Sequence, residues 1–163
     1  MIVTPFDSID WADPAIQISK HVCVQEAIGL PSWQNRLATP ADGMTAAVQQ
    51  ALFDFLTGPF DELLDGLGLR AHVDCCYRPI SYNAKVGGAP QSAHMCLGPW
   101  AAIDWKPLDP MSSQVLSCDD VRQRILDAGW LDKLNLRMER KDGSSWVHND
   151  SRPPGPAGRY FVP

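Results

Sequence analysis

The sequence predicts an α+β domain in which a small antiparallel sheet is flanked by helices. From residue 45 to residue 67, apolar side chains recur every three or four positions, which is typical of a helix with one buried face. The segments 69–77, 101–105 and 134–150 instead carry short apolar or alternating runs, which indicate strands. The order is helices, strand, loop, strand, helix and hairpin, and such an order favours the α+β class.

The length and composition predict a single domain that spans residues 1–163. Hydrophobic residues make up 45% of the chain and charged residues 20%, as in a globular protein with a packed core. We divide the domain into an irregular N-terminal arm (1–40), a core (41–152) and a tail (153–163). Four prolines interrupt the arm, and within it residues 16–23 are expected to be a short strand or a segment lying over the core.

The first helical stretch is expected to kink or break at Gly58 and Pro59, because proline cannot continue the helical hydrogen bonds. A second short helix should then end at the glycines near residue 67. Residues 81–100 are expected to be loop-rich, and Gly87 and Gly88 within them are interpreted as residues of a tight turn with positive φ.

The second half of the chain is predicted to supply a further helix and a hairpin. Ser117 resembles the first residue of a capping box, and the helix that it begins should end near Gly129. The alternating segments 134–139 and 145–150 flank a turn at 141–144, so we expect them to pair as a hairpin.

Composition also excludes several classes of partner. The net charge is −5 and no long basic run is present, which argues against nucleic acid or an anionic membrane surface as the main partner. No window approaches the roughly 18 apolar residues of a membrane span. The first residues lack the pattern of a signal peptide, so we expect synthesis in a cytoplasm. The five cysteines are expected to be reduced and mostly buried.

His94, Asp104 and His148 form a candidate metal site. Two imidazoles and one carboxylate are a ligand set that zinc accepts, and a catalytic zinc keeps its fourth position for water. Asp104 and His148 lie on predicted strands, so both can face one side of the sheet if those strands are neighbours. A mixed site that includes Cys96 is a weaker alternative, because Cys96 lies only two residues from His94.

The segment from Cys76 to His94, CYRPISYNAKVGGAPQSAH, resembles the signature of the M15 zinc peptidases. This family contains D-alanyl-D-alanine carboxypeptidases and peptidoglycan endopeptidases, and it shares its core fold with the hedgehog signalling domain. In its pattern, YRSPxxN, VGG and SxH are followed by an Ala-x-Asp strand and a Trp-x-His-x-Asp strand, which here ends at Asp150. The resemblance covers most of residues 16–152 and implies a hedgehog/DD-peptidase-like fold.

The resemblance implies that His94, Asp104 and His148 bind one zinc ion per chain. It also implies that Arg78 and Ser92 bind the substrate, and the planar fork of an arginine suits a carboxylate. Other interpretations remain for these two residues: a salt bridge or a loop-pinning hydrogen bond for Arg78, and a turn-forming hydroxyl for Ser92.

The chain departs from the family pattern at two places. Nine residues separate His94 from Asp104 instead of six, and the surplus is expected to fit between residues 96 and 100 and to reshape the rim of the zinc cleft. Ser145 stands where many members carry an acidic general base. Asp150 and Asp142 are the candidate replacements; Asp150 is favoured, although it could equally serve as an acceptor that supports a metal ligand. Trp146 is expected in the core, and His21 and His72 are interpreted as structural.

These observations predict a zinc-dependent peptidase that hydrolyses peptide bonds in peptidoglycan stem peptides, as a carboxypeptidase or as an endolysin-type endopeptidase. Without a signal peptide, such an enzyme would reach the cell wall as a lysin of a phage or prophage. The alternative is a non-catalytic zinc-containing binding module or virion structural module on the same fold. The bond that is cut and the oligomeric state stay open.

Overall fold

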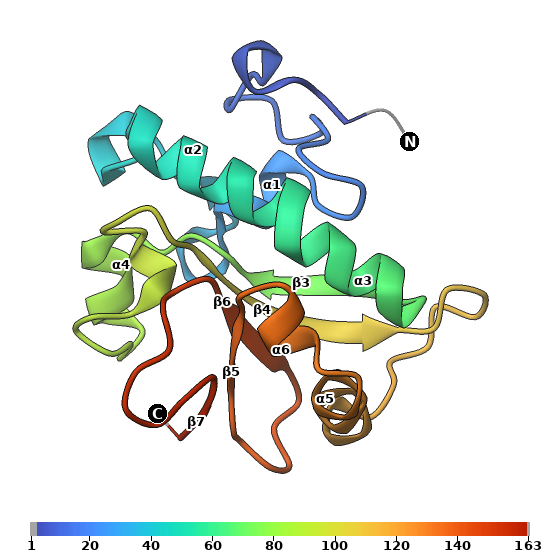
Figure 1. Cartoon of the computed structure of the whole chain (residues 1–163). Helices are drawn as coiled ribbons and strands as arrows, with labels where there is room; N and C mark the ends of the chain where they lie inside the picture. Colours follow the sequence, from blue (N-terminus) through green and yellow to red (C-terminus); the bar gives the residue numbers. More distant parts are fainter. Residues whose placement is uncertain (1–2, 163) are drawn as a thin grey trace.

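The computed structural model describes residues 3–162 and shows helices packed against a five-stranded sheet (Figure 1). The strand order is β3 (Arg70–Cys75), β4 (Ala102–Leu108), β6 (Val147–Asp150), β5 (Arg137–Glu139) and β7 (Tyr160–Phe161). Neighbouring strands are antiparallel except at the edge, where β7 runs parallel to β5. The α+β class is therefore confirmed. The expectation of a purely antiparallel sheet is wrong at this edge, because the predicted tail returns and pairs with the hairpin.

The long helical element consists of α2 (Ala46–Phe55), the π-helical turn η4 (Leu56–Phe60) and α3 (Asp61–Leu67). Figure 1 shows them following one another along one side of the sheet. The expected kink or break at Pro59 is replaced by the π turn, whose wider spacing accommodates a residue without an N–H group. The Thr57 hydroxyl donates to the Phe53 carbonyl at 2.7 Å, which gives that carbonyl a partner within the turn.

Several short elements lie where the sequence predicted irregular structure. The arm contains α1 (Val24–Ile28) and a small antiparallel sheet of β1 (Gly29–Leu30) and β2 (Arg36–Leu37), and the loop-rich stretch contains α4 (Ile80–Lys85). Helices this short are stable only through tertiary contacts, so local sequence does not reveal them. The short 3-10 turns are η1 (Phe6–Ser8), η2 (Pro31–Trp33), η3 (Pro40–Asp42) and η5 (Ala93–Met95).

The second half of the chain follows the prediction closely. Helix α5 (Cys118–Asp127) begins after Ser117, whose hydroxyl accepts the N–H of Asp120 at 3.2 Å. Helix α6 (Trp130–Lys133) follows and was not predicted. Strands β5 and β6 pair as the expected hairpin, and all five cysteines are free thiols.

The two faces of the sheet have different roles. Ile103, Trp105 and Val147 are completely buried on the helical side, where the ring of Trp105 meets the edge of Phe60 at a centroid distance of 5.7 Å. Because successive strand residues point to opposite faces, Asp104 and the residue after Val147 project to the other side. The core therefore anchors the strands that carry two of the three candidate ligands.

Trp105 also donates a hydrogen bond from Nε1 to Oδ1 of the completely buried Asn149 at 2.9 Å. We expect Trp105→Phe to lower the free energy of unfolding by about 1–3 kcal/mol, because the buried amide oxygen loses its donor. Denaturant titration of both proteins measures the difference. Trp11→Phe, at a partly buried ring, is the control, and an equal loss in both variants would contradict this role of the hydrogen bond.

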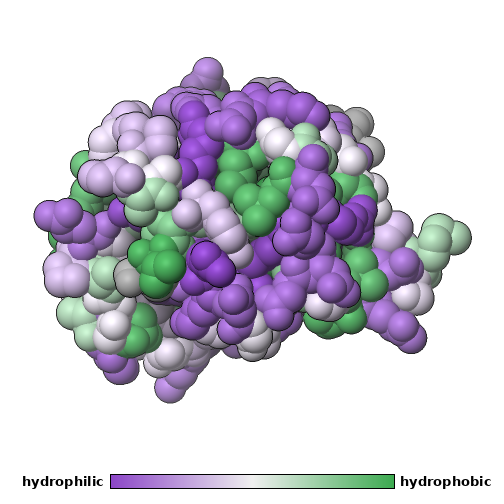
Figure 2. All heavy atoms as spheres, turned by 60° about the horizontal axis from the view of Figure 1, so that its bottom comes forward, coloured by the Kyte–Doolittle hydropathy of each residue, from purple (hydrophilic) through white to green (hydrophobic). Residues whose placement is uncertain are grey.

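Within residues 3–162, no helix has both the length and the hydropathy that crossing a bilayer requires. Figure 2 shows hydrophilic side chains surrounding separate, smaller hydrophobic patches on the face turned forward. The large hydrophobic side chains that are exposed come from scattered positions: Ile80, Val86, Leu97, Met111, Val115 and Val162. The pictured face therefore presents no single continuous apolar surface.

Candidate metal centre

The structure brings the predicted trio together from three different elements. His94 lies on η5, Asp104 on β4 and His148 on β6, and the last two are directly paired across neighbouring strands. All three are buried, and each offers one ligand atom within 4.8 Å of the others. Because rigid strands and a capped turn hold them, they can bind a metal ion with little rearrangement.

The spacing of the ligand atoms suits a small metal ion. Oδ1 of Asp104 lies 2.7 Å from Nδ1 of His148 and 3.2 Å from Nε2 of His94. In a tetrahedral site with bonds of 2.0–2.1 Å, neighbouring ligand atoms are separated by about 3.3 Å. To hold such an ion, the distance between Oδ1 of Asp104 and Nδ1 of His148 would need to increase only slightly.

Hydrogen bonds outside the trio orient both imidazole rings. Nδ1 of His94 lies 2.6 Å from the carbonyl oxygen of Cys76, so this nitrogen carries the proton and Nε2 is left for a metal. In His148 the roles of the two ring nitrogens are exchanged. Its Nε2 lies 3.3 Å from Oδ2 of Asp150, and its Nδ1 faces Asp104. The two histidines therefore present different nitrogens to the same point.

The metal-free trio is held as a cluster of opposite charges. Burial alone would lower the pKa of His94, but the Asp104 carboxylate beside it raises that pKa to about 10. Burial alone would raise the pKa of Asp104, but the charge of His94 and hydrogen bonds from both histidines hold it well below its usual range. A metal ion would replace these protons and take over the role of the positive charge.

Arg78 and Ser92 both lie at the site, and each contacts a residue of the trio. Nη2 of Arg78 donates to Oδ2 of Asp104 at 2.6 Å, and its Nε donates to Sγ of Cys75 at 3.0 Å. The hydroxyl of Ser92 accepts the backbone N–H of His94 at 3.3 Å and so caps η5. Both side chains also line the cavity at the trio. Their binding of a substrate stays a prediction.

The two predicted replacement bases occupy very different places. Asp150 is completely buried, where it accepts a hydrogen bond from Arg152 at 2.9 Å and lies 3.3 Å from Nε of Arg137. It contacts the ring nitrogen of His148 that points away from Asp104. Asp142 is exposed in the hairpin turn and is not among the residues lining the cavity.

The trio opens onto a cavity of about 580 Å³, and the sequence did not reveal most of the residues that line it. Its other walls include side chains of the hairpin and the tail: Arg137, Glu139, Lys141, Trp146, Arg152 and Phe161. Trp146 is thus a wall of the cavity rather than the core residue expected, and the ammonium of Lys141 lies 4.4 Å from the centre of its ring. Arg137, Glu139 and Lys141 are every second residue, so a strand would place them on one face. Which face that is depends on the strand register, which the sequence does not give.

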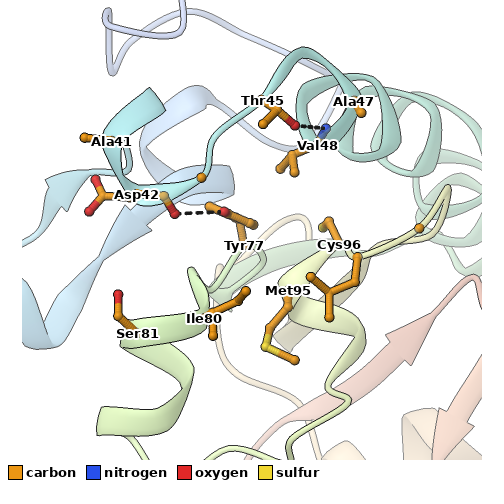
Figure 3. A pocket seen from close by; sticks show the side chains of 13 residues that line it. Ala41, Asp42, Thr45, Ala47, Val48, Tyr77, Ile80, Ser81, Met95 and Cys96 are labelled. Atoms are coloured by element: carbon orange, nitrogen blue, oxygen red, sulfur yellow. Dashed lines mark hydrogen bonds between the residues drawn. The ribbon is translucent and has the colours of Figure 1, made fainter.

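A larger cavity of about 700 Å³ lies beside Met95, the last residue of η5 (Figure 3). It is bordered by the start of α2, by α4 and by the segment 95–98, and Figure 3 shows Val48, Ile80 and Met95 around it. Part of the longer connection between His94 and Asp104 therefore lines this neighbouring cavity. None of residues 95–100 is among those that line the cavity at the trio.

The positive φ expected for both glycines of the VGG segment is found at Gly87 but not at Gly88, which is needed for close packing instead. Gly87 has a φ of 72°, and a Cβ atom on Gly88 would lie 2.1 Å from Oδ1 of Asn83. The side-chain amide of Asn83 in turn donates to the carbonyl of Ala89 at 2.9 Å. This close packing holds the loop that leads to Ser92.

Comparisons with protein-family models, with curated proteins and with solved structures find no match to this chain.

We expect Asp150→Asn to weaken metal binding by about 10–100-fold, because an amide orients the imidazole of His148 less strongly than a carboxylate does. Competition with a chromophoric chelator measures the affinity, and circular dichroism verifies the fold. Asp142→Asn, which removes an exposed carboxylate from the same hairpin, is the matched control. Equal affinities in the two variants would show that Asp150 does not support the metal site.

Proposed function

We propose that this chain is a zinc-dependent peptidase that hydrolyses peptide bonds in peptidoglycan stem peptides. The observation that carries the proposal is a trio of buried candidate ligands that opens onto a cavity and that no fourth ligand among residues 3–162 closes. Three protein ligands with an open position are typical of catalytic zinc, whereas structural zinc usually has four. The resemblance of residues 76–94 to the M15 peptidases supports the choice of metal and substrate.

The electrostatics of the cavity favour an anionic substrate. The chain carries a net charge of −5, yet four cationic side chains line this cavity. Three carboxylates balance them in part: Asp104 and Glu139 in the lining, and the buried Asp150, which pairs with two of the four cations. The four are Arg78, Arg137, Lys141 and Arg152. Stem peptides carry free carboxylates, which arginine and lysine bind through charge-assisted hydrogen bonds. The basic cavity in an acidic protein therefore supports a peptide substrate with carboxylates.

A bound zinc would supply Lewis acidity, which polarises a carbonyl group and makes water more acidic. The residues of the chain provide the rest. Arg78 holds Asp104 in place through Oδ2, and the ring of Trp146 forms an apolar wall on which a peptide can lie. The cations at the rim orient the substrate, which brings its scissile bond to the trio.

A non-catalytic binding module on the same fold is the second candidate. The observation that favours it is Ser145, an exposed residue without a carboxylate at the position where the family pattern has its base. Such a module would bind zinc and peptidoglycan but leave the peptides intact. If the chain is a peptidase, we propose that it acts as a lysin of a phage or prophage. If it is a binding module, we propose a structural role in a virion.

Digestion of purified peptidoglycan tests the proposal. Zinc-loaded protein is incubated with the substrate, and the soluble products are separated and identified by mass spectrometry. We expect new free amino groups and shortened stem peptides, and their masses identify the bond that is cut. Unchanged muropeptides, together with sedimentation of the zinc-loaded protein with the wall, would support the binding module instead.

A further inference from the structure

Glu139 lies on the face of β5 that carries the metal-binding side chains. Met138 pairs with Asn149 and is completely buried in the core, so the next residue of β5 lies beside His148 and points to the opposite face. Arg137, two residues before Glu139, points to the same face, because its Nε lies 3.3 Å from Oδ1 of Asp150. Glu139 and His148 are therefore neighbours on one face of the hairpin.

Glu139 is a free carboxylate in the cavity of the trio. It lines the same cavity as His94, Asp104 and His148, and among the described lining residues Asp104 is the only other acid. Asp104 is occupied by both histidines and by Arg78. Glu139 is half-buried, and within residues 3–162 its carboxylate has no hydrogen bond or ion pair of the kind that holds Asp150.

We propose that Glu139 is the general base of the hydrolytic reaction, an inference that rests on the proposed function. A water oxygen forms a bond to the scissile carbonyl carbon while Glu139 takes a proton from that water. The C–N bond then breaks, and Glu139 returns the proton to the nitrogen of the leaving amine. The residue thereby fulfils, from a different strand, the role for which Ser145 has no suitable group.

The experiment compares Glu139→Gln, Glu139→Asp and the control Glu62→Gln, which removes an exposed carboxylate from α3. Each is measured for zinc content, for peptidoglycan hydrolysis and for calorimetric binding of acetohydroxamic acid to the zinc-loaded protein. A hydroxamate chelates zinc and donates a hydrogen bond to a carboxylate beside the metal, so its binding reports on Glu139 independently of turnover.

We expect Glu139→Gln to retain one zinc per chain, to lose about 10²–10⁴-fold in hydrolysis and to bind the hydroxamate about tenfold more weakly or worse. Glu139→Asp should recover part of both losses, and Glu62→Gln should match the wild type. Full hydrolysis by Glu139→Gln would overturn the inference and leave the proposed function standing. If the wild type cleaves nothing, the peptidase proposal fails, and the assignment of Glu139 as the general base of that hydrolysis fails with it. In that case the hydroxamate tests only whether Glu139 lies beside the open metal position. Equal hydroxamate binding by Glu139→Gln and the wild type would overturn that position of Glu139 as well.

Discussion

Zinc content is expected to fall from one ion per chain to none in His94→Ala and in His148→Ala. Each change removes one of only three protein ligands, and the two that remain cannot hold the ion in competition with a chelating buffer. Inductively coupled plasma mass spectrometry of desalted protein measures the ratio. His72→Ala is the matched control, because this histidine has a side chain that is 61% exposed and lies outside the trio.

Either substitution also leaves the buried Asp104 with one fewer positively charged partner, so the fold of each variant must be measured beside its zinc content. His94→Asn and His148→Asn keep a polar group in the same space and serve as second variants. Loss of zinc in a folded variant supports the site. A folded double variant of both histidines that still retains one zinc per chain would contradict it.

The sequence predicted the elements that carry the ligands more accurately than those that surround them. The segments 101–105 and 145–150 have strong strand patterns, so strands that carry Asp104 and His148 could be expected, whereas the pairing of these two strands became known only from the structure. Helices α1 and α4 could not be expected, because elements of five or six residues depend on tertiary contacts. Strand β7 escaped prediction since two residues carry no periodic signal.

In the candidate site, too, the sequence indicates some residues by their chemical type, whereas others can be placed only when the strand register is known. A set of two histidines and one aspartate has recognisable chemistry in a sequence, whereas a single glutamate such as Glu139 has none. Its position beside His148 follows from the pairing of Met138 with Asn149, and the sequence alone does not determine that register. The expectation that Trp146 lies in the core is wrong for the same reason: the apolar type of a residue does not indicate on which side of the sheet it lies, and Trp146 immediately precedes β6.

Removal of the metal should abolish peptidoglycan hydrolysis completely, and zinc should restore it. Treatment with 1,10-phenanthroline takes the ion from the trio, whereas the isomer 1,7-phenanthroline cannot chelate it and is the matched control. The reason for the loss is that the chain then holds a charge-paired cluster of His94, Asp104 and His148 at the point where Lewis acidity is needed. Release of products from labelled peptidoglycan measures the activity.

The metal that restores activity tests the chemistry of the ligands in the same preparation. Magnesium should not restore hydrolysis, because it requires near-octahedral oxygen coordination and the trio offers two imidazole nitrogens. Zinc should restore it in proportion to the fraction of sites refilled. Because one folded chain is compared with and without its ion, misfolding cannot account for the loss. Undiminished hydrolysis by protein shown to be free of metal would refute a metal-dependent mechanism and leave the trio as a structural ion-pair cluster.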